Sequence, residues 1–359
     1  MPVVPSSSTP SFPNSEIWII GGYGDVGQKL ARLLLATGSY RVVLAGRNAE
    51  KARTAAEQLG ANARGAHVDA AEGLPGDAQV VVNFVETLPP AAAAAVVERG
   101  GVFIDASADP DYLERLKAAV PNGPGLAILN AGLTPGLTNV LARSLKTAHP
   151  DTRRIDVVLE MGMGRHHGLA ATEWTLRGFA APYRAKRNGV WRDIAPGSER
   201  RSACLDPTQK LVPAIGFAFS DQIAMAHTLD LDEARTFLAL APASMTRLLG
   251  TLAGTGPGRF IARRATPIAK LFAALPVMGP IRTRLLVEAF DARGQKRGSY
   301  VMRSGDQSDL TAAMLQVAVS AGLASEVTGA VDLDEVADLD ACVSALEETM
   351  PETVWDRVA

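Results

Sequence analysis

Cysteine is scarce in this sequence: its 359 residues include two, Cys204 and Cys342, which lie far apart. This count excludes a disulfide-stabilised scaffold and favours a reducing compartment, so we expect a cytoplasmic protein. No apolar run reaches about 18 residues, so no membrane-spanning helix is expected. The formal net charge of −2 gives no general attraction to nucleic acid. No cluster of histidine, cysteine and acidic residues has ligand spacing, so we expect no metal.

The length of the chain is sufficient for two domains. Residues 1–15 are rich in proline and serine without a basic or apolar segment, so we expect a disordered leader rather than a signal peptide. Strand and helix patterns then alternate as far as about residue 130, which predicts a parallel sheet. Strands are expected at 16–20, 41–45, 64–69, 79–84, 101–105 and 126–129, and helices at 26–37, 49–60, 89–99 and 109–119.

The pattern changes after a further helix at 136–148. Strands are expected at 153–163, 211–219 and 284–290, and the last of these returns through a hairpin into "GSYVMR". Another helix should begin near Ser308, its expected N-cap, and pack on the first domain. The predicted fold class is α/β, with an N-terminal Rossmann domain (a doubly wound parallel sheet) and a second, α+β domain with a mixed sheet. The expected domains are 16–150, 151–306 and a C-terminal helical part, 307–359, that packs on the first.

A glycine-rich turn, "GGYGDVG" at 21–27, follows the first expected strand and opens a helix. In a G-x-G-x-x-G motif the first glycine allows the tight turn, the second lets a pyrophosphate approach, and the third lets the helix pack closely on the sheet. The alternative is a glycine-rich turn that binds no cofactor. No Lys-Ser/Thr pair follows, which argues against a nucleoside triphosphate. The expected cofactor contacts in this turn are Gly22, Tyr23, Gly24, Asp25, Val26 and Gly27.

The second expected strand ends in "LAGRN", where an acid would favour NAD by bonding the ribose 2′-hydroxyl. Arg47 stands there instead, and no acid occurs until Glu50. An arginine can pair with a 2′-phosphate and stack on adenine, and Asn48 with the following helix start can add donors. We therefore expect NADP(H) as the cofactor. The alternative is that Arg47 is a solvated turn residue and either cofactor binds.

Residues at the ends of the other expected strands are further candidates for the cofactor site, because ligands lie outside the carboxyl ends of such strands. These candidates are Asp69, Asn83, Phe84 and Ser107.

The sequence also resembles the saccharopine dehydrogenase-like reductases, an NADP-binding family. The resemblance rests on "GGYGDVG" at 21–27, "LAGRNAEKA" at 44–52, "NAGLTPGLTNVLA" at 130–142 and the C-terminal run that starts with "GSYVMRSGDQSDL". It is weak between about residues 165 and 283. The resemblance implies a Rossmann domain, a mixed-sheet substrate domain and a homodimer formed through that sheet. It also implies hydride transfer to or from a C=N bond of a small molecule, with Gly132, Pro135 and Gly136 at the nicotinamide end. Some family members act on lipid-linked or polyketide double bonds, so an enoyl or carbonyl reductase is an alternative.

The loop after the expected strand at 153–163 carries the candidates for chemistry. Reduction of an imine requires a proton near neutral pH, so His166 or His167 is a candidate general acid and Arg165 a candidate carboxylate clamp. The alternative is a solvated loop. Glu173 could orient a histidine or be a surface acid, and Trp174 beside it is a candidate substrate contact. Tyr183 could donate a proton, or it could pack at a domain interface.

Acidic residues are absent between Glu233 and Glu288. The intervening region, 235–284, is basic and contains apolar helical segments, so it could contact an anionic membrane or an acidic acyl-carrier protein. The alternative is a helical cap or dimer surface whose arginines pair with acids elsewhere. The alternative to an oxidoreductase is a non-catalytic protein that binds NADP and acts as a sensor or a scaffold.

Overall fold

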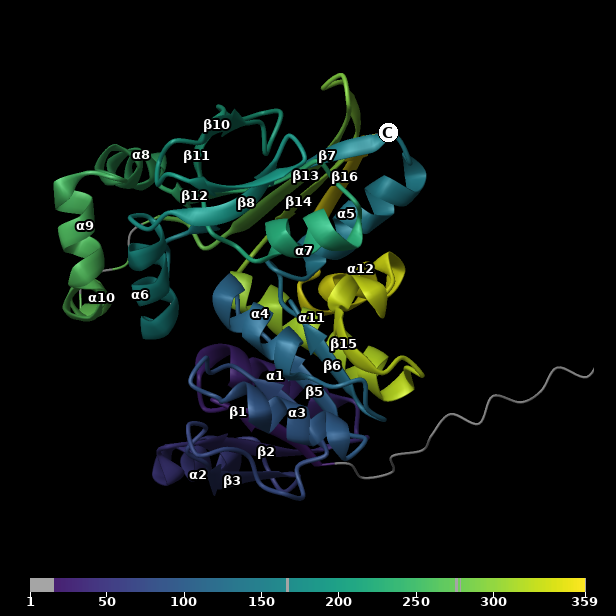
Figure 1. Ribbon diagram of the computed structural model, residues 1–359. Coiled ribbons are helices and arrows are strands. Elements are labelled where there is room, and N and C mark those ends of the chain that lie inside the picture. Colours follow the sequence, from purple (N-terminus) through teal and green to yellow (C-terminus); the bar gives the residue numbers. More distant parts are fainter. Residues whose placement is uncertain (1–15, 166–167, 275–276, 278, 359) are drawn as a thin grey trace, which may run out of the picture. The chain divides into compact units, whose positions relative to one another are not determined.

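The computed structural model describes residues 16–165, 168–274, 277 and 279–358. The expected leader at 1–15 lies outside them. The chain divides into two compact units, and each has its own seven-stranded sheet (Figure 1). The first unit contains the described residues up to 107 together with 112–131 and 312–337, and the second contains 108–111, 132–311 and 338–359.

The sheet of the first unit is entirely parallel, in the order β15-β6-β5-β4-β1-β2-β3. Strands β2 and β3 lie on one side of β1 and strands β4 to β6 on the other, so the order reverses between β1 and β4. This is the doubly wound arrangement, which opens a ligand crevice at the carboxyl ends of its strands. The strands are β1 Glu16–Ile20, β2 Arg41–Gly46, β3 Ala63–His67, β4 Val80–Asn83, β5 Val102–Asp105, β6 Leu126–Leu129 and β15 Gly329–Asp332.

Helices on the sheet of the first unit bury its short, mostly apolar strands. The core joins Val43, Val81 and Phe103 of the strands to Val97 of α3 and Leu116 of α4. Burial on both faces explains why these strands read as continuous apolar runs rather than as alternating patterns. The helices are α1 Asp25–Ala36, α2 Ala49–Glu57, α3 Pro90–Glu98, α4 Pro110–Ala119 and the first-unit part of α11 Gln307–Ala324.

The C-terminal helix α11 returns to the first unit, as predicted. A Cβ atom at Gly322 would lie 2.7 Å from Val102 Cγ1, so this helix packs directly on β5. Strand β15 then joins the parallel sheet beside β6. The expected C-terminal part, 307–359, does not belong to the first unit as far as its end. Residues from 338 onward belong to the second unit. Its last strand, β16 Val354–Val358, pairs antiparallel with β14 there.

The sheet of the second unit is mixed, in the order β10-β11-β12-β7-β13-β14-β16. Strand β7 is central, parallel to β12 and antiparallel to β13. A separate hairpin of β8 and β9 turns at Asn188 and Gly189, which both have positive φ, 51° and 75°. The strands are β7 Thr152–Gly162, β8 Tyr183–Arg187, β9 Val190–Ile194, β10 Arg200–Ala203, β11 Val212–Gly216, β12 Glu233–Ala241, β13 Thr283–Asp291 and β14 Lys296–Ser304.

The helices of the second unit divide into two groups. Helices α5, α7 and α8 contact the sheet, whereas α9 and α10 pack on α6. Helix α11 begins at Gln307, and Asp306 rather than the expected Ser308 caps it, because Asp306 Oδ1 accepts from the Ser308 amide at 3.0 Å. The bounds are α5 Leu137–Ala148, α6 Leu169–Gly178, α7 Asp221–Thr228, α8 Ala243–Leu252, α9 Gly256–Arg263, α10 Ala265–Ala274 and α12 Leu339–Thr349.

Candidate functional site

The glycine turn of the first unit has the geometry that its spacing predicts. A Cβ atom on Gly22 would lie 2.6 Å from Ile19 O, and one on Gly27 would lie 2.7 Å from Gly22 Cα, so both positions exclude larger residues. Gly24 is exposed, and the nearest atom to a Cβ built on it is Gly21 O at 3.2 Å. The turn is therefore closed on its sheet side and open on its solvent side.

The first turn of α1 supplies the amide groups for an anion. The helix begins at Asp25, and the first intrahelical acceptor is Gly24 O, which binds the Gln28 amide at 3.0 Å. The backbone amides of the first turn, such as those of Val26 and Gly27, lie at the N-terminus of the helix, where such groups can donate to a pyrophosphate. The carboxylate of Asp25 is paired with Lys29 at 3.7 Å, one turn further on, which offsets its charge beside the turn.

Tyr23 lies across the end of β2. A Cβ atom on Gly46 would be 2.5 Å from Tyr23 Cε1, so the half-buried ring requires a glycine at the last position of that strand. Arg47 is the residue that follows Gly46 along the chain. Tyr23 and Arg47 therefore follow the carboxyl ends of β1 and β2, the region where an adenosine ribose meets a Rossmann domain.

Arg47 and Asn48 are both exposed at the carboxyl end of β2. Asn48 is the N-cap of α2, because its Oδ1 accepts from the Lys51 amide at 2.9 Å. The nearest following acid, Glu50, already belongs to the first turn of α2. Asp69 follows the neighbouring strand β3, where its Oδ1 accepts from the Ala71 amide at 3.1 Å and closes a tight turn.

The ends of β4 and β5 form a buried polar cluster. The amide nitrogen of Asn83 donates to Asp105 Oδ2 at 2.8 Å and to the Tyr112 hydroxyl at 3.2 Å. The Ser107 amide donates to Asp105 Oδ1 at 2.8 Å. Burial raises the pKa of Asp105 to about 6, and burial followed by the neighbouring Asp105 charge raises the pKa of Tyr112. Sequence reasoning selected Asn83 and Ser107 as cofactor contacts but missed Tyr112, which stands alone in a helical pattern.

Phe84, the residue after Asn83, is half-buried beside the glycine turn. Its Cβ lies 3.3 Å from the position that a Cβ on Gly21 would take, and its amide donates to Ile20 O at 3.1 Å. The first unit thus brings together the predicted contacts from the ends of β1, β2 and β4. The open glycine turn, the N-terminal amides of α1 and the exposed Arg47 fit a nicotinamide dinucleotide.

The loop at 132–136 lies in the second unit. The Gly132 amide donates to Pro135 O at 2.8 Å, and the Gly136 amide donates to Asn139 Oδ1 at 3.1 Å. Gly136 has φ of 131° and therefore needs the freedom of glycine. This turn starts α5 at Leu137, and the expected role of Gly132, Pro135 and Gly136 at the nicotinamide end stays a prediction.

The predicted catalytic loop is described only in part. His166 and His167 lie outside the described residues. Arg165 forms an ion pair with Asp306, the residue that caps α11, so its guanidinium has an acidic partner within the second unit.

The other second-unit candidates are held by neighbouring side chains. Glu173 on α6 accepts from Arg177 and from the Thr266 hydroxyl, and these bonds lower its pKa. The Trp174 ring lies 4.9 Å from Phe217 and packs edge-on against it. This aromatic contact is compatible with a substrate wall and with a structural core.

Tyr183 belongs to a buried ion-pair cluster at the start of β8. Its hydroxyl donates to Glu199 Oε2 at 3.0 Å, and Arg187 binds the same carboxylate through Nε and Nη2, both at 2.7 Å. Burial raises the pKa of Tyr183, and the negative charge of Glu199 raises it further. Burial opposes ionisation of Glu199, but the Arg187 hydrogen bonds hold the pKa of that carboxyl below its usual value. The proton of Tyr183 is therefore held on its oxygen, which does not favour a role as proton donor.

Asp221 is the second fully buried acid with a raised pKa. Its Oδ1 accepts from the Thr236 hydroxyl at 2.7 Å, and burial raises its pKa to about 6. Asp221 is the first residue of α7, whose N-cap is Ser220. The burial has no local sequence signal, because it depends on the packing of α7 against β12.

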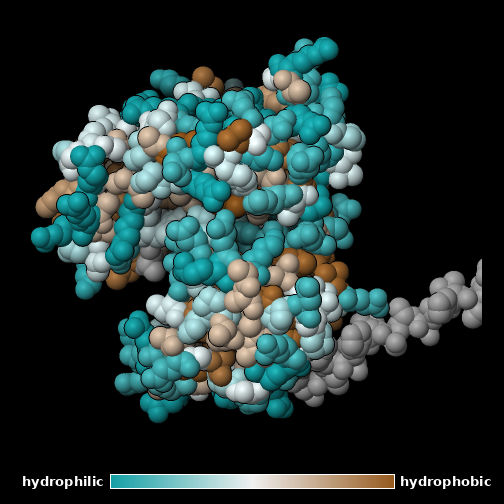
Figure 2. Space-filling model, in the orientation of Figure 1, coloured by the Kyte–Doolittle hydropathy of each residue, from teal (hydrophilic) through white to brown (hydrophobic). Residues whose placement is uncertain are grey.

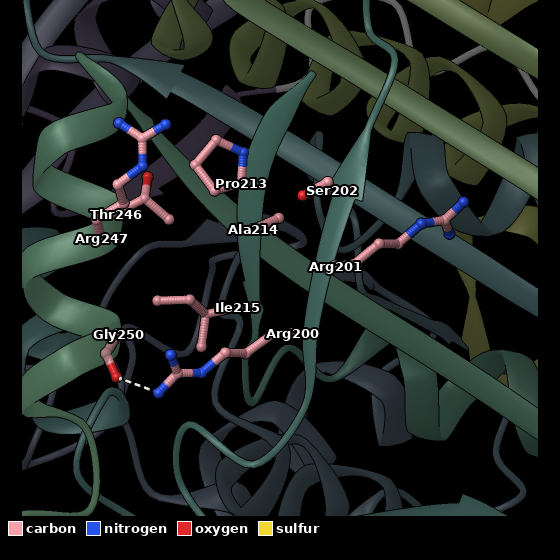
Figure 3. Close-up of a pocket in the computed structure, with 9 residues that line it drawn as sticks. All are labelled: Arg200, Arg201, Ser202, Pro213, Ala214, Ile215, Thr246, Arg247 and Gly250. Carbon is pink, nitrogen blue, oxygen red and sulfur yellow. Dashed lines mark hydrogen bonds between the residues drawn. The ribbon is translucent and has the colours of Figure 1, made fainter. Parts of the chain in front are cut away.

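A pocket of about 270 Å³ lies elsewhere in the second unit, between α8 and strands β10 and β11 (Figure 3). Its floor is apolar, and Arg200 at its rim donates to Gly250 O at 2.8 Å. The side chain of Arg201 points away from the pocket, toward its partners Asp156 and Glu288. None of the predicted site residues lines this pocket. The lining residues are Arg200, Arg201, Ser202, Pro213, Ala214, Ile215, Thr246, Arg247 and Gly250.

Comparison with known proteins places this geometry among oxidoreductases. Residues 16–109 match the family described as NADP oxidoreductase, coenzyme F420-dependent. The saccharopine dehydrogenase (L-Glu forming) of Saccharomyces cerevisiae superposes with a TM-score of 0.64 at 10% sequence identity, over 96% of this chain and 100% of that chain. The chain has the saccharopine dehydrogenase fold. The predicted resemblance is thus confirmed at the level of the fold.

Two further structures are similar over most of the chain but superpose less well. A myo-inositol dehydrogenase from Corynebacterium glutamicum has a TM-score of 0.44 at 12% identity, over 96% of this chain and 100% of that chain. A probable dehydrogenase from Thermotoga maritima has a TM-score of 0.44 at 10% identity, over 95% and 98%. No curated protein matches the sequence. The family match of residues 16–109 confirms the predicted class, an oxidoreductase with a nicotinamide dinucleotide-binding domain.

Proposed function

We propose that this protein is an NADPH-dependent reductase that acts on a C=N bond of a small molecule. The observation that carries the choice of cofactor is the exposed Arg47 at the end of β2, with no acid between it and Glu50. An acid at the end of this strand would repel a 2′-phosphate, whereas a guanidinium pairs with it.

The residues of the first unit divide the binding task. The N-terminal amides of α1, those of Val26 and Gly27 among them, would bind the pyrophosphate, and Gly24 would leave room for it. Arg47 would neutralise the 2′-phosphate, and Tyr23 would lie against the adenosine. Bound NADPH would supply the hydride to the imine carbon. His166 or His167 remains the proposed donor of the proton that the imine nitrogen takes up.

The cofactor choice is tested by titrating the protein with NADPH and with NADH while nicotinamide fluorescence is followed. We expect NADPH to bind at least tenfold more tightly, about 1.4 kcal/mol, and Arg47→Ala to remove most of that difference. Arg41→Ala is the matched control, because Arg41 is also exposed but lies at the opposite end of the same strand. Equal binding of both cofactors by the unmodified protein would contradict the assignment.

The C=N chemistry is tested by NADPH consumption with pairs of amines and carbonyl compounds. An imine forms only from both, so a C=N reductase consumes NADPH only when both are present. Consumption with the carbonyl compound alone would indicate a carbonyl reductase, and consumption with an α,β-unsaturated thioester would indicate an enoyl reductase. Binding of NADPH without consumption by any of these would support the non-catalytic alternative.

A further inference from the structure

Helices α9 and α10 carry an exposed apolar and cationic face. They pack on α6 through Ile261, Ala265, Ile268 and Ala269, which cluster with Leu176. The opposite side of each helix therefore points away from this small core. In Figure 2, hydrophobic and hydrophilic spheres lie next to one another over α9 and α10, at the left of the view.

Large apolar side chains on this face are unusually accessible. Phe260 on α9 is 62% exposed and Leu271 on α10 is 61% exposed, the two highest values for large hydrophobic residues in the described part of the chain. Leu248 on the preceding helix α8 is 52% exposed. Single exposed hydrophobic residues are common, but a group on consecutive helices indicates a contact surface.

Cations alternate with these apolar side chains. Arg263, Arg264 and Lys270 are exposed, and the exposed positions 260, 263, 264, 267, 270 and 271 recur at helical spacing. Arg264 lies 5.9 Å from the centroid of the Phe260 ring. Among the described side chains, no acid lies within ion-pair distance of these three cations.

The structure reduces the number of cations in the basic region, 235–284, that are available to a partner. Arg235 at one end of 235–284 pairs with Glu233, and Arg282 and Arg284 at the other end pair with Glu160 in the sheet. These arginines balance acids of the second unit and are not available to a partner. The cations left over belong to α8, α9 and α10, where the chain has no acid at all.

We propose that the exposed face of α9 and α10 docks on an anionic membrane surface. Phe260 and Leu271 would enter the headgroup–acyl boundary while Arg263, Arg264 and Lys270 contact lipid phosphates and carboxylates. A surface with cations on both sides of apolar side chains complements such a membrane. Glu173 of α6, which contacts α10 through Thr266, is an acid near this face, and it is already paired with Arg177. No helix among the described residues is long and apolar enough to cross a membrane, so the contact would be interfacial. The proposal does not depend on the nicotinamide chemistry.

Vesicle flotation tests this docking, with phosphatidylcholine vesicles that contain or lack phosphatidylserine. We expect the full chain to float with the anionic vesicles at low salt and not with the neutral ones. The triple variant Arg263→Gln, Arg264→Gln, Lys270→Gln should bind about 100-fold more weakly, since each cation near such a surface contributes about fivefold. The double variant Phe260→Ser, Leu271→Ser should also lose binding. It keeps the cations but lacks the apolar side chains that would insert into the membrane.

Matched controls separate this face from general charge and hydrophobicity. The triple variant Lys51→Gln, Arg192→Gln, Arg293→Gln removes three exposed cations elsewhere, and Leu211→Ser removes an exposed leucine of 60% accessibility. Both should float like the unmodified protein. All variants change exposed side chains, so an unaltered circular dichroism spectrum and an unaltered thermal unfolding midpoint will show that the fold persists.

Three outcomes would overturn the proposal. In the first, the unmodified protein does not float with anionic vesicles. In the second, it floats equally well with neutral vesicles. In the third, the control variants lose as much flotation as the α9–α10 variants. Failure to float together with co-elution of an acyl-carrier protein in gel filtration, lost in the α9–α10 variants, would assign this face to an acidic protein instead.

Discussion

The amide nitrogen of Asn83 donates a 2.8 Å hydrogen bond to Oδ2 of Asp105, the residue that ends the neighbouring parallel strand. Both side chains are completely buried. The same amide group also donates to Val85 O at 3.1 Å, so it is committed to holding the ends of β4 and β5 in place. Asn83 therefore supports the shape of the strand ends, and a direct contact of its side chain with a cofactor stays a prediction.

This pair makes the stability of the first unit depend on pH. Because the pKa of folded Asp105 is about 6, above the ordinary 3.8, the folded state retains its proton more readily than the unfolded state. The stability from burying the neutral acid is fully present below the ordinary pKa and is lost as the pH rises through 6. The loss is about 3 kcal/mol at neutral pH.

We predict that Asn83→Leu costs more stability at about pH 7.5 than at about pH 5. The ionised Asp105 loses its main donor, which raises its pKa further, whereas the neutral acid loses less. The expected cost at the higher pH is about 1–3 kcal/mol, measured by urea unfolding. Asn62→Leu, at an exposed position of the same unit, is the control. An equal cost at both pH values would show that Asn83 does not act through the Asp105 charge.

The glycine turn leads to a second prediction. Gly27→Ala places a Cβ atom 2.7 Å from Gly22 Cα and Gly22 O, which are backbone atoms that cannot move aside easily. We expect a loss of about 1–3 kcal/mol in unfolding free energy and a marked fall in NADPH affinity, measured by thermal unfolding and fluorescence titration. Gly76→Ala is the matched control, since no atom lies within 4 Å of the new Cβ. If Gly27→Ala binds NADPH as tightly as the unmodified protein, the glycine turn does not contribute to cofactor binding.

The first unit could be predicted well from sequence, because its short buried strands and its glycine turn are local signals. The expected strand at 126–129 agrees with β6 Leu126–Leu129.

In the second unit, the expected strand at 153–163 is shifted by one residue from β7 Thr152–Gly162. The hairpin of β8 and β9 was missed although Asn188-Gly189 is a strong turn signal. Its strands, "YRAKR" and "VWRDI", are so charged that they do not resemble strands of a core.

The polar interior of the second unit could not be predicted from single residues. Glu160 and Arg284 face one another on β7 and β13, 124 positions apart, and their ion pair is buried. A lone charged residue in a strand pattern usually indicates an exposed position, and only the register reveals its partner. The same holds for Tyr183, whose partner Glu199 lies beyond the unpredicted hairpin.

Tyr183 leads to a third prediction, which separates a structural from a catalytic role. Tyr183→Phe should cost about 1.5–3 kcal/mol of unfolding free energy, because one hydrogen bond to the ionised Glu199 is lost and the ring remains. Glu199→Gln should cost about 3–5 kcal/mol, because it leaves Arg187 buried without its counter-charge. Urea unfolding measures both. NADPH oxidation by Tyr183→Phe should be unaltered, and a loss of turnover without a loss of stability would restore Tyr183 as a candidate proton donor.

Asn48 supports a fourth prediction, because its two proposed roles respond differently to one substitution. As the N-cap of α2 it accepts from the Lys51 amide, and an aspartate caps equally well. Asn48→Asp should therefore keep the unfolding free energy, whereas Asn48→Ala should lower it by about 1 kcal/mol. Beside a bound 2′-phosphate, however, the new carboxylate is a like charge. We expect Asn48→Asp to weaken NADPH binding by about tenfold, or about 1.4 kcal/mol, and to leave NADH binding unaltered. Equal effects on both cofactors would place the 2′-phosphate away from the end of β2, and the assignment of Arg47 would then fail with it.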